Sequence, residues 1–206
     1  MNPQFRIDLP ARLAGSDPVI LELGCGRRPQ PGRICIDQLD MPHIDIVADL
    51  AQGLPFLPDN SVDEVHSRSF LEHVSPLEPL MREIWRVLKP GGRTHIFVPH
   101  FSNAYYYSDT SHRTAFGLYS FEYFSARQTR FKRKVPAFYH DFGFTTEEIR
   151  LVFDSPWRWR RQLRKAVGLL ANLSPGCQEF YEENLCGWLS VYGLQAVLRA
   201  EKTPLR

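Results

Sequence analysis

The stretch VILELGCG, residues 19–26, decides the fold of this chain. A short apolar run that stops abruptly at turn residues is typical of a strand buried inside a parallel sheet. Gly24 and Gly26 have no Cβ, so the backbone there can turn sharply and approach a ligand closely. Open α/β sheets bind their ligands at the carboxyl ends of such strands. The stretch therefore predicts a central strand followed by a ligand-binding loop.

The composition fits one soluble globular domain. The chain has 206 residues, 43% of them hydrophobic and 23% charged, which are ordinary shares. A formal net charge of +2 implies no general attraction to nucleic acid or to membranes. We find no apolar run near the ~18 residues of a membrane span, and no signal-peptide pattern at the N-terminus. The four cysteines lack C-x-x-C spacing and are too few for a disulfide scaffold, so we expect a protein of a reducing compartment, the cytoplasm.

Alternating apolar runs and crossovers predict the remaining elements. Beyond the first strand, we expect strands at residues 33–37, 44–49, 62–67, 93–98, 144–153 and 194–200. The clearest helix spans residues 72–88, because apolar side chains recur there at helical spacing and Lys-Pro-Gly-Gly follows. Further helices are expected at residues 157–173 and 181–189. Strands that alternate with crossovers indicate a parallel, doubly wound sheet.

Five short motifs occur in a fixed order. They are ELGCG (22–26), Asp37, ADL with LPF (48–56), SVDEV with LEHV (61–74) and RVLKPGG (86–92). In this order they resemble the class I S-adenosylmethionine-dependent methyltransferases, over residues 19–98 and more weakly to the end. The resemblance implies a single Rossmann-like α/β domain over residues 1–206, with a mostly parallel seven-stranded sheet and an antiparallel last strand. It also implies S-adenosylmethionine as cofactor and S-adenosylhomocysteine as product.

The resemblance assigns a set of cofactor-binding residues: Glu22, Gly24, Cys25, Gly26, Arg27, Asp37, Gln38, Asp49, Leu50 and Ser67. The glycine turn would meet the methionine part of the cofactor without a steric clash. A carboxylate at Asp37 can accept hydrogen bonds from both ribose hydroxyls, as strand-terminal acids do in dinucleotide sites. Asp49 would accept from the adenine amino group, with Leu50 against the ring. Glu22 could instead hold the turn without touching the ligand.

The first crossover departs from the family pattern. Only fifteen positions separate Glu22 from Asp37, and prolines fill the middle. Prolines and glycines argue against a helix there. We therefore expect the first crossover helix to be shortened or missing, with Arg27 or Arg28 near the carboxylate of the cofactor.

The methyl acceptor should bind just past the strand tips, in an acceptor-site insertion at residues 99–142. Methyl transfer is an in-line displacement, and a hydroxyl acceptor also requires removal of a proton. The candidates for this chemistry are His100, Asp109, His112 and Arg113, since histidine titrates near neutrality. These residues could equally satisfy the loop backbone. Nearby side chains could line the acceptor pocket or be structural: His73, Tyr105, Tyr106 and Tyr107.

Residues 155–190 would form a helical lid between the last two strands. Its first part, residues 157–165, holds five cations and two tryptophans and leads into an apolar stretch. Three interpretations stay open: a solvated helix packed by its apolar stripe, an interfacial helix on anionic lipid, or a nucleic-acid surface. A single short patch supports the last of these least.

The sequence thus predicts a methyltransferase acting on an oxygen of a small molecule, such as a sugar or a lipid-linked intermediate. No N-P-P-Y signature of amide or nucleobase-amine methylation is found, and the acceptor class is inferred by analogy. The alternatives are an RNA or protein methyltransferase that uses the basic surface, or a catalytically inactive cofactor-binding subunit. We expect no metal site. We expect a cytoplasmic protein, with peripheral contact to the inner membrane face through residues 157–173 left open.

Overall fold

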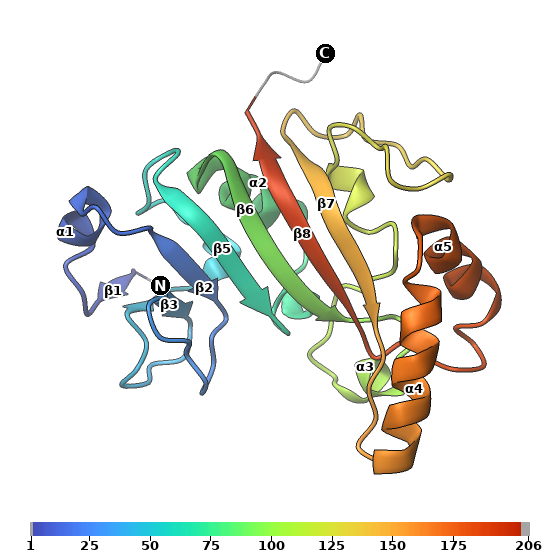
Figure 1. The fold of residues 1–206 in the computed structure, drawn as a ribbon. Coiled ribbons are helices and arrows are strands. Elements are labelled where there is room, and N and C mark those ends of the chain that lie inside the picture. The colour runs from blue at the N-terminus through green and yellow to red at the C-terminus, as the bar shows by residue number, and fades with distance from the viewer. Residues whose placement is uncertain (1, 203–206) are drawn as a thin grey trace.

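The computed structural model describes residues 2–202 and contains one eight-stranded sheet (Figure 1). The strands are β1 (Gln4–Phe5), β2 (Ile20–Leu23), β3 (Ile34–Asp37), β4 (Ile46–Val47), β5 (Val62–Arg68), β6 (Leu88–Pro99), β7 (Gly143–Val152) and β8 (Gly193–Glu201). Their order in the sheet is β1-β4-β3-β2-β5-β6-β8-β7. Because the chain moves outward from β2 first to β3 and β4 and then to β5 and β6, the strand order reverses between β2 and β5. Ligands bind at such a switch point in α/β sheets.

The strand directions confirm the predicted topology. Strands β2 to β6 are parallel to one another, and β8 is antiparallel to both β6 and β7. The predicted number of seven strands is wrong, because β1 adds an eighth at the edge, antiparallel to β4. This strand has only two residues, both exposed, so it lacks the apolar pattern by which a strand is recognised.

The helices are short and differ in part from the expected bounds. They are α1 (Leu9–Ala14), α2 (Glu78–Val87), α3 (Ala104–Ser108), α4 (Arg158–Ala171) and α5 (Pro175–Asn184), with 3-10 turns η1 (Leu50–Gln52), η2 (Leu71–His73) and η3 (Glu122–Phe124). The helix predicted at 72–88 begins only at Glu78, because Pro76 restricts the chain before it and Pro79 fits the first turn of a helix but not its interior. The helix predicted at 181–189 begins earlier, at Pro175, where the Ser174 side chain caps it. Within residues 2–202 no helix is long and apolar enough to span a membrane.

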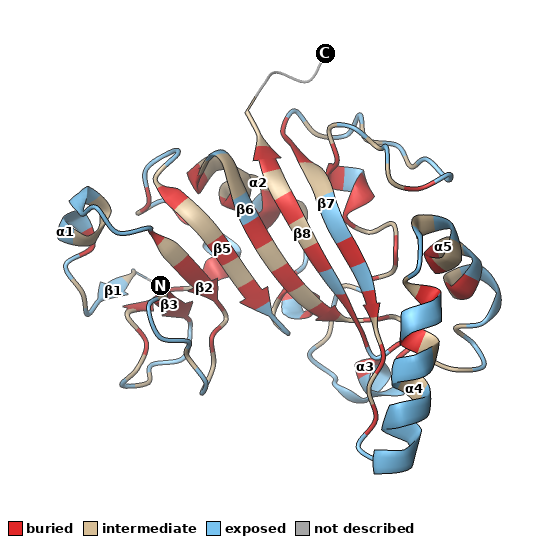
Figure 2. Cartoon of the chain, in the orientation of Figure 1, coloured by how far each residue is buried: buried red, intermediate tan, exposed pale blue. Residues whose placement is uncertain are grey.

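The two faces of the sheet are covered differently (Figures 1 and 2). On the back face α2 packs against β6, and its side chains Leu80, Met81, Ile84 and Val87 are buried. In β5, β6 and β8 buried residues alternate with half-buried or exposed ones. Among the residues that the structure describes, no helix crosses the front of these strands in Figure 1. Parallel strands are usually covered on both faces, so this bare polar face is unusual.

The bare face follows from the first two crossovers. The chain between β2 and β3 forms a loop, which confirms the missing first crossover helix, and the chain between β3 and β4 is also a loop. The apolar core therefore lies mainly behind the sheet. Residues 99–142 contribute aromatic side chains to it, and Phe116, Phe121 and Phe142 are among the fully buried ones.

Candidate active site

The glycine loop after β2 is pressed against a neighbouring segment. Gly24 and Gly26 have φ angles of +67° and +54°, in the left-handed region that favours glycine. A Cβ on Gly24 would lie 2.4 Å from Cγ of Phe70, whereas a Cβ on Gly26 would meet nothing within 4 Å. Position 24 therefore requires glycine for both conformation and space, and position 26 for conformation alone.

The carboxylate of Asp37 holds this loop in place. One oxygen accepts a hydrogen bond from the Gly26 N–H at 2.9 Å, and the other accepts from the Leu39 N–H at 2.9 Å. Asp37 is buried, with 7% of its surface exposed. Each carboxylate oxygen has a second lone pair, so hydrogen bonds to a ribose could be added to those of the loop. Its role toward the cofactor stays a prediction.

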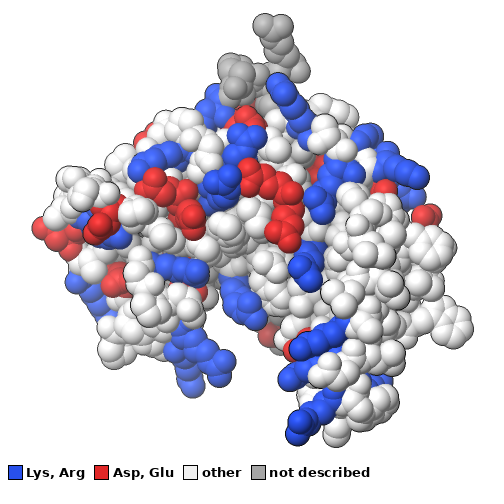
Figure 3. Space-filling model, in the orientation of Figure 1, with Lys and Arg blue, Asp and Glu red and all other residues white. Residues whose placement is uncertain are grey.

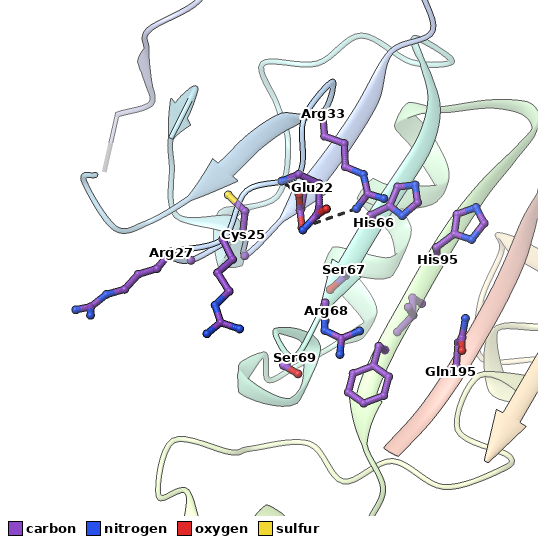
Figure 4. A pocket seen from close by; sticks show the side chains of 16 residues that line it. Glu22, Cys25, Arg27, Arg33, His66, Ser67, Arg68, Ser69, His95 and Gln195 are labelled. Carbon is purple, nitrogen blue, oxygen red and sulfur yellow. Dashed lines mark hydrogen bonds and ion pairs between the residues drawn. The ribbon is translucent and has the colours of Figure 1, made fainter. Parts of the chain in front are cut away.

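Glu22 braces the segment that replaces the first crossover helix. Its Oε2 accepts a hydrogen bond from the Gln30 N–H at 3.0 Å, and its Oε1 lies 3.8 Å from Nη1 of Arg33 (Figure 4). The Glu22 side chain thus connects the end of β2 to the middle of the proline-rich loop at Gln30 and to Arg33 just after it. This geometry supports the alternative that Glu22 holds the turn.

Cys25 of the glycine loop forms a disulfide with Cys35 of β3. The sequence analysis, which considered the cysteines too few for a disulfide scaffold, did not anticipate this single bond. The two Cα atoms lie 6.0 Å apart, because β3 runs beside β2 with Cys35 opposite Glu22 and the loop turns back toward it. A spacing of ten residues gives no sign of this pairing, which the strand register creates. The two remaining cysteines, Cys177 and Cys186, are free.

A cavity of about 800 Å³ opens on the front face between the glycine loop and the ends of β5 and β6 (Figure 4). It brings together six of the predicted cofactor-binding residues: Glu22, Gly24, Cys25, Gly26, Arg27 and Ser67. Four arginines also line it: Arg27, Arg28, Arg33 and Arg68. Within the described part of the chain, only Arg33 among these four has an acidic side chain within 4 Å. The cavity is therefore suited to a ligand with a carboxylate or phosphate group.

Other predicted cofactor residues lie outside this cavity. Asp49 caps η1, where its carboxylate accepts from the Ala51 N–H at 3.0 Å and from the Gln52 side chain at 3.1 Å. Leu50 is buried and Gln38 is exposed. The adenine and ribose contacts proposed for this side of the sheet stay predictions.

A second cavity, of about 460 Å³, lies past the tips of β5 and β6. Its polar lining includes two imidazoles and two carboxylates, from His73, His112, Glu72 and Asp109. Aromatic side chains from α3 and from the segment before β8 complete it: Tyr105, Tyr106 and Tyr192. The second cavity shares Ser69 and Phe97 with the first, so the two cavities adjoin at these residues.

His112 is oriented so that one ring nitrogen can accept a proton. Its Nδ1 lies 2.8 Å from the carbonyl oxygen of Tyr106. Because a carbonyl only accepts, Nδ1 must carry the hydrogen, and Nε2 of the neutral ring then has a free lone pair. Nε2 lies 3.7 Å from Oδ2 of Asp109, whose pKa is lowered mainly by a hydrogen bond from the Ser111 hydroxyl. His112 therefore has the geometry of a general base beside an anion.

Glu72, which the sequence analysis did not single out, is the most perturbed acid of the second cavity. Its side chain is 1% exposed and its Oε2 has no hydrogen-bond partner among the described residues. Burial raises the pKa of Glu72 to about 7, and the charge of Asp109 adds to the rise. The signal that could have identified it is its place in the LEHV motif, directly before His73.

The remaining acceptor-site candidates lie elsewhere. His100 is fully buried, with Nδ1 2.8 Å from the Ser102 hydroxyl and Nε2 2.8 Å from Glu182 of α5, and it lines neither cavity. Arg113 is exposed, and its backbone N–H donates to the Glu72 carbonyl at 2.7 Å. His73, expected to be structural, lines the second cavity. The structure thus brings His112 and Asp109 together and separates them from His100.

Comparisons with known proteins point to a methyltransferase domain. Residues 21–96 match the family of the methyltransferase domain. A 62-residue segment is 39% identical to demethylmenaquinone methyltransferases of Listeria welshimeri and Listeria monocytogenes, covering 30% of this chain. The match spans 26% of the length of these relatives.

Solved structures share the fold. An S-adenosylmethionine-dependent methyltransferase from Archaeoglobus fulgidus aligns with a TM-score of 0.56 at 13% identity, covering 89% of this chain and 86% of that one. The YcgJ protein of Bacillus subtilis aligns with a TM-score of 0.52 at 18% identity, covering 90% and 92%. The domain match over residues 21–96 and this shared fold support a class I S-adenosylmethionine-dependent methyltransferase.

Proposed function

We propose that this chain transfers a methyl group from S-adenosylmethionine to an oxygen atom of a small-molecule acceptor. The observation that carries the proposal is the contact between the two cavities at Ser69 and Phe97. In-line transfer requires donor and acceptor to lie on either side of one methyl group, held in fixed positions. A cofactor in the first cavity and an acceptor in the second would meet at these two residues.

The lining of the first cavity fits the methionine part of the cofactor. Ser67 is buried, its hydroxyl has no hydrogen-bond partner among the described residues, and it lines the cavity. A ligand carboxylate or ammonium group would satisfy it. Arg27 and Arg28 would pair with the carboxylate, since neither has an acidic partner within residues 2–202. When bound, S-adenosylmethionine supplies an electrophilic methyl group and leaves as S-adenosylhomocysteine.

The second cavity supplies the acid and base groups for an acceptor hydroxyl. His112 would take the hydroxyl proton at Nε2, and Asp109 would stabilise the imidazolium that forms. A protonated Glu72 would donate a hydrogen bond and orient the acceptor, because its raised pKa keeps much of it neutral near pH 7. A volume of about 460 Å³ is in the range of small-molecule sites, which supports a small acceptor over a polymer.

An acceptor screen tests this function. Formation of S-adenosylhomocysteine would be followed with sugars, lipid-linked intermediates and demethylmenaquinone as candidate acceptors. We expect turnover with one class, and loss of that turnover in His112→Ala. Cofactor binding without turnover on any acceptor would support the inactive-subunit alternative. Turnover on RNA, with salt-sensitive RNA retention, would support the polymer alternative.

The start of α4 leads us to extend the proposal to a lipid-linked acceptor at an anionic membrane surface. Among α4 residues only Gly168 and Ala171 are buried, so the apolar stripe expected to pack in the core is largely exposed. Trp157 and Trp159 are 61% and 72% exposed. Five cations lie between residues 158 and 165, and residues 155–178 contain no acid. Tryptophans beside cations are typical of helices at an anionic lipid interface.

This surface adjoins the acceptor cavity. Ser155, Pro156 and Arg161 line that cavity, so the exposed start of α4 lies at its rim. Figure 3 shows basic side chains on both sides of the hollow between the glycine loop and α4. A lipid-linked acceptor would thus pass from the membrane surface directly into the second cavity.

Vesicle flotation tests the membrane contact. We expect the protein to float with phosphatidylcholine vesicles that contain phosphatidylglycerol, and less with phosphatidylcholine alone. The double variant Trp157→Ser, Trp159→Ser should lose flotation. Phe138→Ser is the matched control, because Phe138 is an 80% exposed aromatic outside this helix. Equal flotation of the double variant and the control would contradict membrane contact through α4.

A further inference from the structure

The bare front face of the sheet holds three side chains of the metal-binding kinds. Glu64 and His66 project from β5 two residues apart, and His95 lies on β6 directly beside His66 in the strand register. Figure 4 shows His66 and His95 side by side at the end of the first cavity. No sequence pattern indicates this group, because its two histidines are 29 positions apart and only strand pairing joins them.

The ligand atoms of these three side chains converge. Oε2 of Glu64 lies 2.9 Å from Nε2 of His66 and 3.8 Å from Nε2 of His95, and the ligand atoms all lie within 4.8 Å of one another. In a tetrahedral zinc site with bonds of about 2.0–2.2 Å, neighbouring ligand atoms are roughly 3.3–3.5 Å apart. The two distances to Glu64 bracket this range. The imidazole rings of His66 and His95 are stacked, with centroids 4.5 Å apart and an angle of 8° between their planes, so binding one ion requires the rings to rotate toward each other.

The cations near Glu64 pair with other acids, so the Glu64 carboxylate stays available to bind an ion together with the two histidines. The nearby Arg33 lies 3.8 Å from Glu22, and Arg93 pairs with Glu147 at 2.7 Å. Both cations thus have acidic partners other than Glu64. The side chains of Glu64, His66 and His95 are 39%, 18% and 34% exposed, which leaves an ion a path to the site.

We propose that Glu64, His66 and His95 bind a divalent transition-metal ion, with Zn²⁺ as the best match. Two imidazoles and one carboxylate are a donor set that Zn²⁺ uses, and three protein ligands leave the fourth position open. His66 and His95 line the first cavity, so the open position faces it. The site lies on rigid, paired strands and is distinct from His112 and the acceptor cavity.

Metal titration tests this site. Metal-free protein would be titrated with Zn²⁺ by calorimetry and with Co²⁺ by visible absorption, which reports tetrahedral coordination. We expect one tightly bound ion at this site. His95→Ala and Glu64→Gln should each weaken binding at least about tenfold, since even the loss of an outer-shell partner costs roughly 10- to 100-fold. The control Gln195→Ala, an exposed side chain lining the same cavity, should leave the affinity unchanged.

Two results would overturn the proposal. One is the absence of Zn²⁺ binding by the wild-type protein. The other is binding that both His95→Ala and Glu64→Gln leave intact, which would place the ion at His73 and His112 or at the free cysteines. Circular dichroism of the metal-free variants establishes that they fold. Should His95→Ala unfold, the near-isosteric Glu64→Gln still decides the question.

Discussion

The two cavities of this protein differ in how far sequence motifs describe them. Half of the residues that line the first, eight of sixteen, belong to one continuous segment, residues 22–33, which carries the ELGCG motif, and the rest come from residues 66–69, 95–97 and 195. The second collects side chains from four separate segments, at residues 69–73, 97–112, 154–161 and 192. The resemblance to methyltransferases therefore marks the cavity proposed for the cofactor more fully than the cavity proposed for the acceptor. The resemblance can be read from the sequence for this reason, and the acceptor cannot.

Among changes at the first cavity, substitution of Gly24 in the glycine loop should lower the free energy of unfolding most. In Gly24→Ala the new Cβ would overlap Phe70 in a left-handed backbone. We expect a loss of about 2–5 kcal/mol in the free energy of unfolding, from left-handed strain and overpacking together. Urea denaturation measures it. Gly26→Ala is the matched control and should lose only about 1–2 kcal/mol, because its Cβ meets nothing. Equal losses in the two variants would refute the packing of Phe70 on Gly24.

Glu72 in the second cavity should contribute a comparable change in the free energy of unfolding, and this change depends on pH. Its folded-state pKa of about 7 exceeds the ordinary value of 4.5. The contribution of Glu72 to the free energy of unfolding is therefore fully present below pH 4.5. It falls by about 3 kcal/mol as the pH rises from there through 7. Denaturation across this range should show a smaller decline in Glu72→Gln than in the wild type. Glu148 is exposed, so Glu148→Gln should show the same decline in the free energy of unfolding as the wild type. If Glu72→Gln also shows the wild-type decline, the pKa of Glu72 is not raised by burial.

Substitution of His112 should affect turnover but not cofactor binding, and it therefore distinguishes the functions proposed for the two cavities. His112→Ala should slow turnover by about 10²-fold or more, which corresponds to about 2.7 kcal/mol, because the proton acceptor at Nε2 is lost. The affinity for S-adenosylmethionine should stay near that of the wild type, since His112 does not line the first cavity. Steady-state kinetics with the acceptor from the screen, and calorimetry with the cofactor, measure the two quantities. An unchanged turnover would remove His112 from the chemistry.

Substitution of Asp37 tests whether its carboxylate binds the cofactor. Asp37→Ala would remove the acceptor of the Gly26 N–H and the hydrogen bonds expected from the ribose. We expect the cofactor affinity to fall by about 1–3 kcal/mol. Calorimetric titration measures this loss, with the melting temperature as a check on the loop itself. Unchanged affinity would show that Asp37 only braces the loop.

Much of the fold could be predicted because the decisive signals are local. The apolar run before Gly24, the prolines of the shortened crossover and the alternation of β8 each lie within about ten residues. The features that were missed depend on neighbours distant in sequence. The Cys25–Cys35 disulfide and the pair His66 and His95 exist because of strand register.

The acceptor side was only partly predictable for the same reason. His112 and Asp109 were proposed together because they are close together in the chain, and both line the second cavity; their catalytic role stays a prediction. Burial of Glu72 and of His100 could not be read from the sequence, because it is set by segments that pack on them from far away. His100, for example, is paired with Glu182, 82 positions later.

The most direct test of the account is calorimetric titration of the purified protein with S-adenosylmethionine and S-adenosylhomocysteine. We expect both to bind with micromolar affinity, and we expect Arg27→Ala together with Arg28→Ala to weaken both, because the two ligands share the carboxylate that these residues would pair with. Absence of binding by both ligands would contradict the assignment of the first cavity to the cofactor.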